Sequence, residues 1–198
     1  CSIYALGYVN HFYKKYNIGV LGFFYNTFIA SMILVVTAQH AVFFLIVWEI
    51  MSLTSYFLVI YEQHEEKNIK AGTLYFIMTH VGTAFILLSF LLAYLATGSF
   101  DFDVIRNGIA AAPPFVRNAI FVSALVGFGA KAGIIPFHIW LPAAHPAAPS
   151  HVSALMSGVM IKTGIYMLAR MCWDILPGTP PLWWGLLTII IGSVSSLL

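Results

Sequence analysis

The sequence predicts an all-α fold, a polytopic bundle of transmembrane helices. Of its 198 residues, 61% are hydrophobic and only 8% are charged, whereas a soluble domain is usually about 25% charged. The apolar residues form long continuous runs instead of the polar–apolar alternation of barrel strands, which favours helices. A soluble protein of this composition would lack the polar surface that keeps proteins dissolved. We therefore expect the lipid bilayer to surround the chain.

The apolar runs define the expected domain organisation, because a spanning helix needs about 20 mostly apolar residues. We expect a single transmembrane domain whose connections are the charged segment 62–70, the longer segment 97–117 and the proline-rich segment 141–149, which is too rich in proline for regular helix. Because the chain begins without Met and ends inside an apolar run, we expect residues 1–198 to be a fragment of a longer protein. The predicted spans are about 18–38, 41–61, 71–96, 118–139, 150–170 and an incomplete 182–198.

Three charged residues, Glu49, Lys131 and Lys162, lie inside these apolar runs. Each costs about 2.5–3.5 kcal/mol at a helix centre on insertion scales, so such residues usually face a bundle interior, a partner or water. They are therefore candidates for function. For Glu49 the alternative is a structural ion pair between two helices. For Lys131 it is a side chain that reaches the membrane interface.

The surroundings of the three residues differ. Glu49 is followed by serine, threonine and tyrosine, which form a polar side of its helix. Lys131 lies among glycine and alanine, ahead of Pro136, which we expect to break the helix. Broken helices at mid-membrane often line ion paths. A buried lysine can also gain or lose a proton when a nearby carboxylate moves toward it or away from it. Lys162 is about halfway along its run, far from either interface.

Histidines cluster around the proline-rich segment. His138 and His145 flank it, and His151 opens the next run, while His80 lies in the third run beside two threonines. Imidazole is the natural proton carrier near neutral pH, although a structural histidine is the alternative for each.

Motifs for catalysis or cofactor binding are missing from the sequence, which has no GxGxxG, P-loop, HExxH, CxxC or nucleophile elbow. The chain thus shows no equipment for a redox cofactor, a metal or covalent catalysis. Its net charge of +2 gives no argument for nucleic acid.

These residues carry a family resemblance. The segment 127–170 (GFGAKAGIIPFHIWLPAAHPAAPSHVSALMSGVMIKTGIYMLAR) resembles the signature of proton-translocating antiporter-like membrane subunits. That family includes subunits of respiratory complex I, Mrp-type cation/proton antiporters and membrane-bound hydrogenases. Segment 48–62 (WEIMSLTSYFLVIYE) resembles the glutamate helix of the family. Segments 71–85 and 145–166 look most like the large membrane subunit of formate hydrogenlyase-type hydrogenases.

The resemblance implies a fold and a set of site residues. The chain would be the first five-helix repeat, helices four to eight, of an antiporter-like fold with a broken helix. Glu49 would match the essential glutamate, Lys131 the lysine of the broken helix and Lys162 the lysine of the helix after it. Proton translocation would use these three residues together with His138, His145 and His151.

The resemblance also implies partners and a location. The chain would be a non-redox proton-channel subunit of an oxidoreductase complex of the hydrogenase or NADH:quinone oxidoreductase type, in the inner (plasma) membrane. It would carry no cofactor, and iron–sulfur and nickel–iron centres would belong to partner subunits, both membrane and peripheral. Two alternatives stay open: an Mrp-type cation/proton antiporter subunit, and a structural scaffold that anchors a soluble enzyme.

Overall fold

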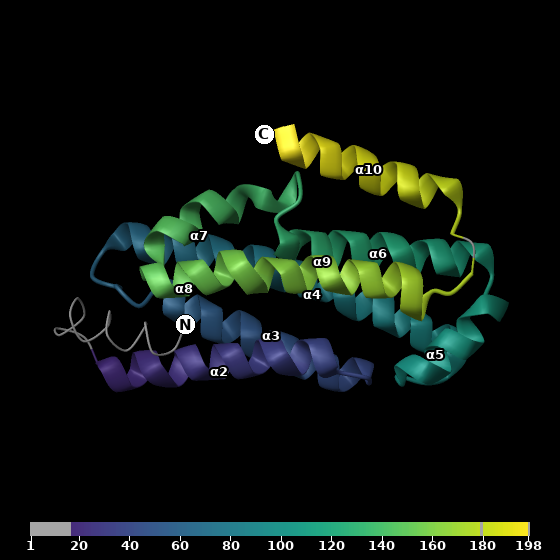
Figure 1. Ribbon diagram of the computed structural model, residues 1–198, viewed down its shortest axis with the longest axis horizontal. Coiled ribbons are helices and arrows are strands. Elements are labelled where there is room, and N and C mark those ends of the chain that lie inside the picture. Colours follow the sequence, from purple (N-terminus) through teal and green to yellow (C-terminus); the bar gives the residue numbers. More distant parts are fainter. Residues whose placement is uncertain (1–16, 179, 198) are drawn as a thin grey trace.

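The computed structural model describes residues 17–178 and 180–197, and these residues form a bundle of helices that run along its long axis (Figure 1). The predicted all-α fold is confirmed over this part of the chain. The helices are α2 (Ile18–Thr37), α3 (Ala41–Val59), α4 (Glu66–Thr97), α5 (Phe102–Gly108), η1 (Ile109–Ala111), α6 (Pro114–Ala132), η2 (Phe137–Trp140), α7 (Leu141–Ala147), α8 (Ser150–Leu155), η3 (Met156–Met160), α9 (Ile161–Arg170), η4 (Met171–Ile175) and α10 (Leu182–Leu197).

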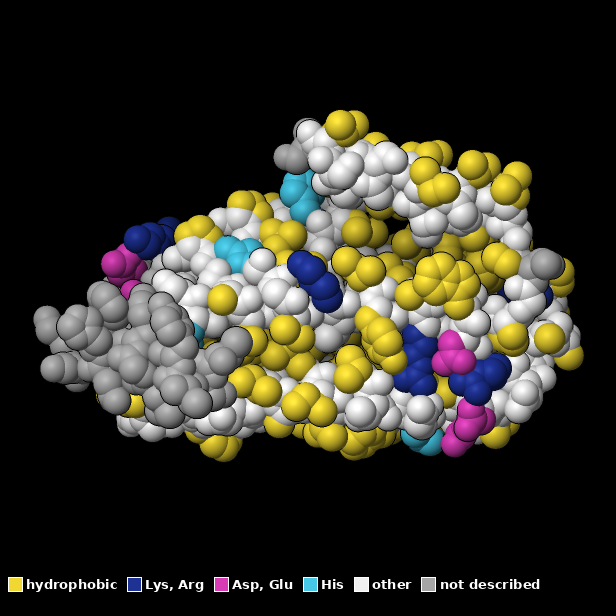
Figure 2. Space-filling view, viewed as in Figure 1, with side chains coloured by type: hydrophobic (Ala, Val, Ile, Leu, Met, Phe, Trp, Pro, Cys, Tyr) yellow, Lys and Arg dark blue, Asp and Glu magenta, His cyan; other side chains and the backbone are white. Residues whose placement is uncertain are grey.

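Five helical stretches in the described residues are long and apolar enough to cross a membrane. Figure 2 shows apolar side chains spread along the length of the bundle, with most of the charged side chains toward its two ends. This distribution matches a multi-pass protein embedded in lipid. The five stretches are Ile18–Thr37, Ala41–Val59, Glu66–Thr97, Pro114–Ala147 and Ser150–Ile175, and the shorter apolar helix α10 follows them.

Helix α4 begins earlier than the sequence suggested. We expected segment 62–70 to be a loop, but the helix starts at Glu66. The Glu66 carboxylate pairs with Lys70 one turn later at 2.8 Å, an (i, i+4) arrangement that stabilises exposed helix. The amide of Asn68 also donates to the carbonyl of Glu62 at 3.1 Å. Charged residues thus extend the helix beyond its apolar run.

The proline-rich segment 141–149 is also partly helical, which corrects the expectation of irregular chain. Helix α7 contains Pro142 in its first turn, where the missing N–H has no helical partner to lose. Pro146 lies in the last turn, and the N–H of Ala148 still donates to the carbonyl of Ala144 at 3.1 Å. A helix this short therefore tolerates both prolines. Likewise, the expected connection 97–117 contains the short helices α5 and η1.

The helix break after Lys131 begins at Gly133 and not at Pro136 as expected. Helix α6 ends at Ala132, and Gly133 adopts a left-handed conformation with φ +71°. Glycine is the residue that adopts this conformation without steric cost. The N–H of Ile134 then donates to the carbonyl of Gly129 at 3.0 Å. Pro136 lies in the turn that leads to η2, beyond the break.

Glycines bring α4, α6 and α9 close together and so position the core of the bundle. A Cβ on Gly127 of α6 would lie 2.8 Å from the carbonyl oxygen of Gly82 on α4. A Cβ on Gly164 of α9 would lie 2.9 Å from the carbonyl oxygen of Phe128 on α6. Such small residues permit close approach between transmembrane helices. The side chain of Lys131 emerges next to these crossings.

Candidate functional site

Lys131 is buried at the centre of the bundle, with 2% of its surface exposed. Its ammonium donates to the hydroxyl of Ser52 on α3 at 2.9 Å and to that of Tyr75 on α4 at 2.8 Å. The ammonium nitrogen also lies 5.0 Å from the ring centroid of Tyr75 and 6.0 Å from that of Trp48. A cation over an aromatic face is attracted by the ring electrons. Neutral oxygens and aromatic rings therefore hold the lysine, in a part of the bundle without lipid contact.

Tyr75 is fixed from two sides. Its hydroxyl lies 2.5 Å from that of Ser55 on α3, and its ring packs at 4.9 Å against the ring of Trp140 on η2. The indole N–H of Trp140 donates in turn to the carbonyl of Ala130 at 2.9 Å. That carbonyl belongs to the last turn of α6, whose carbonyls lack partners within the helix. The broken helix and the lysine-binding tyrosine are thus one packed unit.

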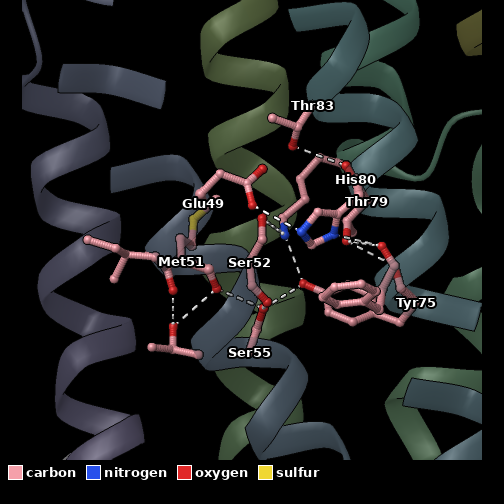
Figure 3. A network of polar contacts seen from close by, with 12 residues as sticks. Glu49, Met51, Ser52, Ser55, Tyr75, Thr79, His80 and Thr83 are labelled. Carbon is pink, nitrogen blue, oxygen red and sulfur yellow. Dashed lines mark hydrogen bonds and ion pairs between the residues drawn. The ribbon is translucent and has the colours of Figure 1, made fainter. Parts of the chain in front are cut away.

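Glu49 lies on the other side of the network, half-buried on α3. Its carboxylate oxygen Oε2 is 3.1 Å from Nε2 of His80 on α4. The second oxygen, Oε1, is buried and has no hydrogen-bond partner among the residues that the structure describes. Figure 3 shows the Glu49 carboxylate directed at the His80 ring, with Tyr75 directed at Ser55.

The structure brings Glu49 and Lys131 into one polar network without pairing them directly. Ser52, which accepts the hydrogen bond from Lys131, follows Glu49 by three residues on α3. Residues three apart on a helix are neighbours on its surface. Within the described residues, the ion-pair partner of Glu49 is His80. The arrangement therefore leaves Glu49 with two possible cationic neighbours, one on each side.

Lys162 lies outside this network. It is exposed on α9, and its ammonium donates to the backbone carbonyl of Ser157 at 2.7 Å. Ser157 belongs to η3, a π-helical turn. Such turns leave irregular backbone geometry and occur often at functional sites.

The three histidines near the break are separate from Lys131 as well. His145 Nδ1 lies 3.0 Å from the hydroxyl of Ser153, and the ring of His151, 6% exposed, packs at 5.1 Å against the ring of Tyr25. Nδ1 of His138 is buried without a hydrogen-bond partner in the described part of the chain. These contacts of His145 and His151 are thus with Ser153 and Tyr25 and not with Lys131.

Sequence reasoning missed Tyr75 and gave His80 no place among the expected site residues. A tyrosine in an apolar run has the ordinary explanation of an interfacial aromatic. An imidazole in an apolar run was a signal for His80, whereas helix packing alone brings Tyr75 to the site. Tyr75 and His80 lie on the third run, and that run packs against the two runs that carry Glu49 and Lys131. Within the described residues, no group of three or more His, Cys, Asp or Glu side chains is placed to hold a metal ion.

Comparisons with known proteins agree with this architecture. The family described as "NADH:quinone oxidoreductase/Mrp antiporter, TM" matches residues 38–198. The chain is 47% identical over its whole length to hydrogenase-4 component B of Escherichia coli (strain K12), of which it covers 29%. It is 30% identical over 98% of its length to formate hydrogenlyase subunit 3 of the same organism, of which it covers 30%.

Solved structures give the same result. The Mrp complex from Dietzia sp. DQ12-45-1b superposes with a TM-score of 0.75 at 29% identity, over 83% of this chain and 18% of that chain. The chain therefore spans less than a third of the length of each of these three relatives.

Proposed function

Because the chain belongs to the NADH:quinone oxidoreductase/Mrp antiporter transmembrane family, we propose that it forms part of a proton-translocating membrane subunit of a hydrogenase or related respiratory redox complex. The observation that carries the proposal is Lys131, a buried lysine beside a helix break whose ammonium donates to two hydroxyls among the described residues. Burial of an ammonium is costly, and ionisable groups inside membranes usually serve transport. Both hydroxyls can rotate, so they can accept from an ammonium or donate to a neutral amine.

Each charged residue has a defined part in this proposal. Lys131 holds and releases the mobile proton. Glu49 sets the charge state of Lys131 through the electric field that it exerts across Ser52, because charges interact strongly where water is scarce. Lys162, on the exposed side of α9, receives the proton next, with His138, His145 and His151 as further carriers near the break.

The proposal includes partners and a location. The electron-transfer chemistry resides on other subunits, where iron–sulfur and nickel–iron centres are expected, and this chain supplies the proton path alone. The assembly lies in the inner (plasma) membrane, with further membrane and peripheral subunits around it. Support comes from the similarity to hydrogenase-4 component B and to formate hydrogenlyase subunit 3.

The test is Lys131→Ala in the full-length subunit, assembled in its complex. Proton pumping into inverted membrane vesicles and electron transfer are measured together. We expect the substitution to abolish pumping while the complex still assembles. Lys67→Ala is the matched control, because that side chain is 77% exposed and pairs only with Glu65 at the bundle end. Pumping at the wild-type rate in an assembled Lys131→Ala complex contradicts the assignment.

A second candidate function is cation/proton exchange without a redox partner. The superposition on the Mrp complex, at 29% identity, favours it. Vesicles that contain the complete protein and no electron donor distinguish the two. A Na⁺ or K⁺ gradient that drives proton movement there supports the antiporter, whereas proton movement that requires electron transfer supports the redox-linked subunit.

A further inference from the structure

We propose that His80 and Glu49 share a single proton, and that His80 thereby determines whether Glu49 presents Lys131 with a carboxylate or a neutral carboxyl group. The inference rests on the proposed function for its biological meaning. His80 is a positioning residue here, since it acts on Lys131 through Glu49. Its basis is the geometry around the His80 ring, which leaves few protonation states open.

One nitrogen of His80 has a fixed role. Nδ1 lies 2.9 Å from the backbone carbonyl oxygen of Phe76. A carbonyl oxygen can only accept a hydrogen bond, so Nδ1 carries a hydrogen and donates it. The ring of Phe76 packs against the imidazole with centroids 3.9 Å apart, which restrains the ring further. Any change in protonation of His80 therefore takes place at Nε2.

The second nitrogen faces the carboxylate. Nε2 lies 3.1 Å from Oε2 of Glu49, a hydrogen-bonding distance that needs one proton between the two atoms. Without it, two lone pairs would face each other. The pair therefore has two states with the same number of protons: imidazolium with carboxylate, and neutral imidazole with carboxylic acid.

Nothing else on the described elements competes for Glu49 at close range. His80 is its one ion-pair partner among the described residues, and Oε1 has no donor there. Lys131 on α6 and Tyr75 on α4 face the pair from the inner side and are coupled to Glu49 electrostatically. Helix α2, which packs against α3, contains no charged side chain and no histidine. His138, His145 and His151 form no ion pair with Glu49.

The shared proton has a direct consequence for Lys131. When it moves from His80 to Glu49, the N–H bond at Nε2 breaks and an O–H bond forms at Oε2. His80 becomes neutral and keeps its hydrogen on Nδ1, while Glu49 loses its negative charge. The Lys131 ammonium then no longer faces a carboxylate across Ser52. The side chains of His80 and Glu49 are 35% and 31% exposed, so the described residues do not close off the outer side of the pair.

Infrared difference spectroscopy of the full-length subunit in its complex tests the proposal. The carboxylic-acid C=O band of Glu49 is identified by its loss in Glu49→Gln and followed against pH. In His80→Arg the cation is permanent, so we expect the band to be lost across the range in which the wild type shows it. In His80→Gln no proton can be shared, so we expect the midpoint of the band to move by about one pH unit or more.

Controls separate this proposal from the proposed function. His40→Gln makes the same substitution at an exposed histidine before α3 and leaves the band as in the wild type. A Glu49 band in His80→Arg and a pH profile in His80→Gln that both equal the wild type refute proton sharing, whatever the pumping rate. The Glu49 band can also change in the His80 variants as expected while the wild-type complex does not pump. That result refutes the proposed function and leaves proton sharing in place. If His80→Arg does not assemble, the His80→Gln profile decides.

Discussion

The crossing of α4 and α6 at Gly127 makes the most quantitative prediction. In Gly127→Ala the new Cβ would lie 2.8 Å from the carbonyl oxygen of Gly82 and 2.8 Å from the backbone nitrogen of Ile86. Both atoms are backbone, so neither can rotate away. Since close C···O contacts lie at about 3.3–3.6 Å, the helices must separate by about 0.5 Å. Overpacking of this kind costs about 1–3 kcal/mol.

The separation also affects the site. Lys131 lies one helical turn after Gly127, and its ammonium is 2.8 Å from the Tyr75 hydroxyl on the opposite helix. A movement of about 0.5 Å would take this contact past the usual upper length of about 3.2 Å for a hydrogen bond. We therefore expect Gly127→Ala to reduce proton pumping as well as stability.

The assay is reversible unfolding of the full-length subunit in detergent or lipid, with Gly22→Ala as the matched control. A Cβ on Gly22 of α2 meets nothing within 4 Å. Both variants gain the same helix propensity on replacement of glycine, about 0.5–1 kcal/mol, so their difference isolates the clash. We expect Gly127→Ala to be about 1–3 kcal/mol less stable than Gly22→Ala. Equal stability of the two variants refutes the reasoning.

Two further substitutions test the packing of the site. Gly133→Ala places a side chain at φ +71° against the side chain of Leu141. We therefore expect the free energy of unfolding to fall by at least about 1–2 kcal/mol. An unchanged free energy of unfolding contradicts the left-handed conformation at the end of α6. Tyr75→Phe removes one of the two hydroxyls that accept from Lys131, so we expect a loss of about 1.5–3 kcal/mol and slower pumping. Tyr94→Phe is the control, because the Tyr94 hydroxyl forms no hydrogen bond in the described structure. Equal effects of the two substitutions would exclude a role for the Tyr75 hydroxyl.

Most of the helical architecture followed from the sequence because apolar runs long enough to span a bilayer have few alternatives. Where the expectation was wrong, local contacts outweighed composition. Segment 66–70 is helical because an ion pair and a side-chain hydrogen bond support a charged first turn. Segment 141–147 is helical because Pro142 lies in the first turn, where an N–H has no helical partner, and because the N–H of Ala148 still bonds to Ala144 beyond Pro146. Single-residue propensities do not contain this information.

The site was less accessible to sequence reasoning than the fold. The cost of a buried charge singled out Glu49, Lys131 and Lys162, and the structure brings the first two into one network and leaves Lys162 exposed on α9. The partner of Lys131, Tyr75, is a common residue in an apolar helix, and only the packing of α4 against α6 makes it a ligand of the ammonium. Its identification requires the helix crossing angle and rotation, which depend on tertiary contacts.

The helix break itself contributes to holding the lysine. Lys131 is the second-last residue of α6, because Gly133 ends the helix at Ala132. The last carbonyls of a helix carry a partial negative charge, which favours a cation there by about 0.3–1 kcal/mol, and by more in partly buried geometries. Trp140, across the break, satisfies the carbonyl of Ala130 with its indole N–H. In an uninterrupted helix the neighbouring carbonyls would bond along the chain and this favourable field would be absent. The break therefore gives the buried ammonium electrostatic support in addition to that of the Glu49 carboxylate.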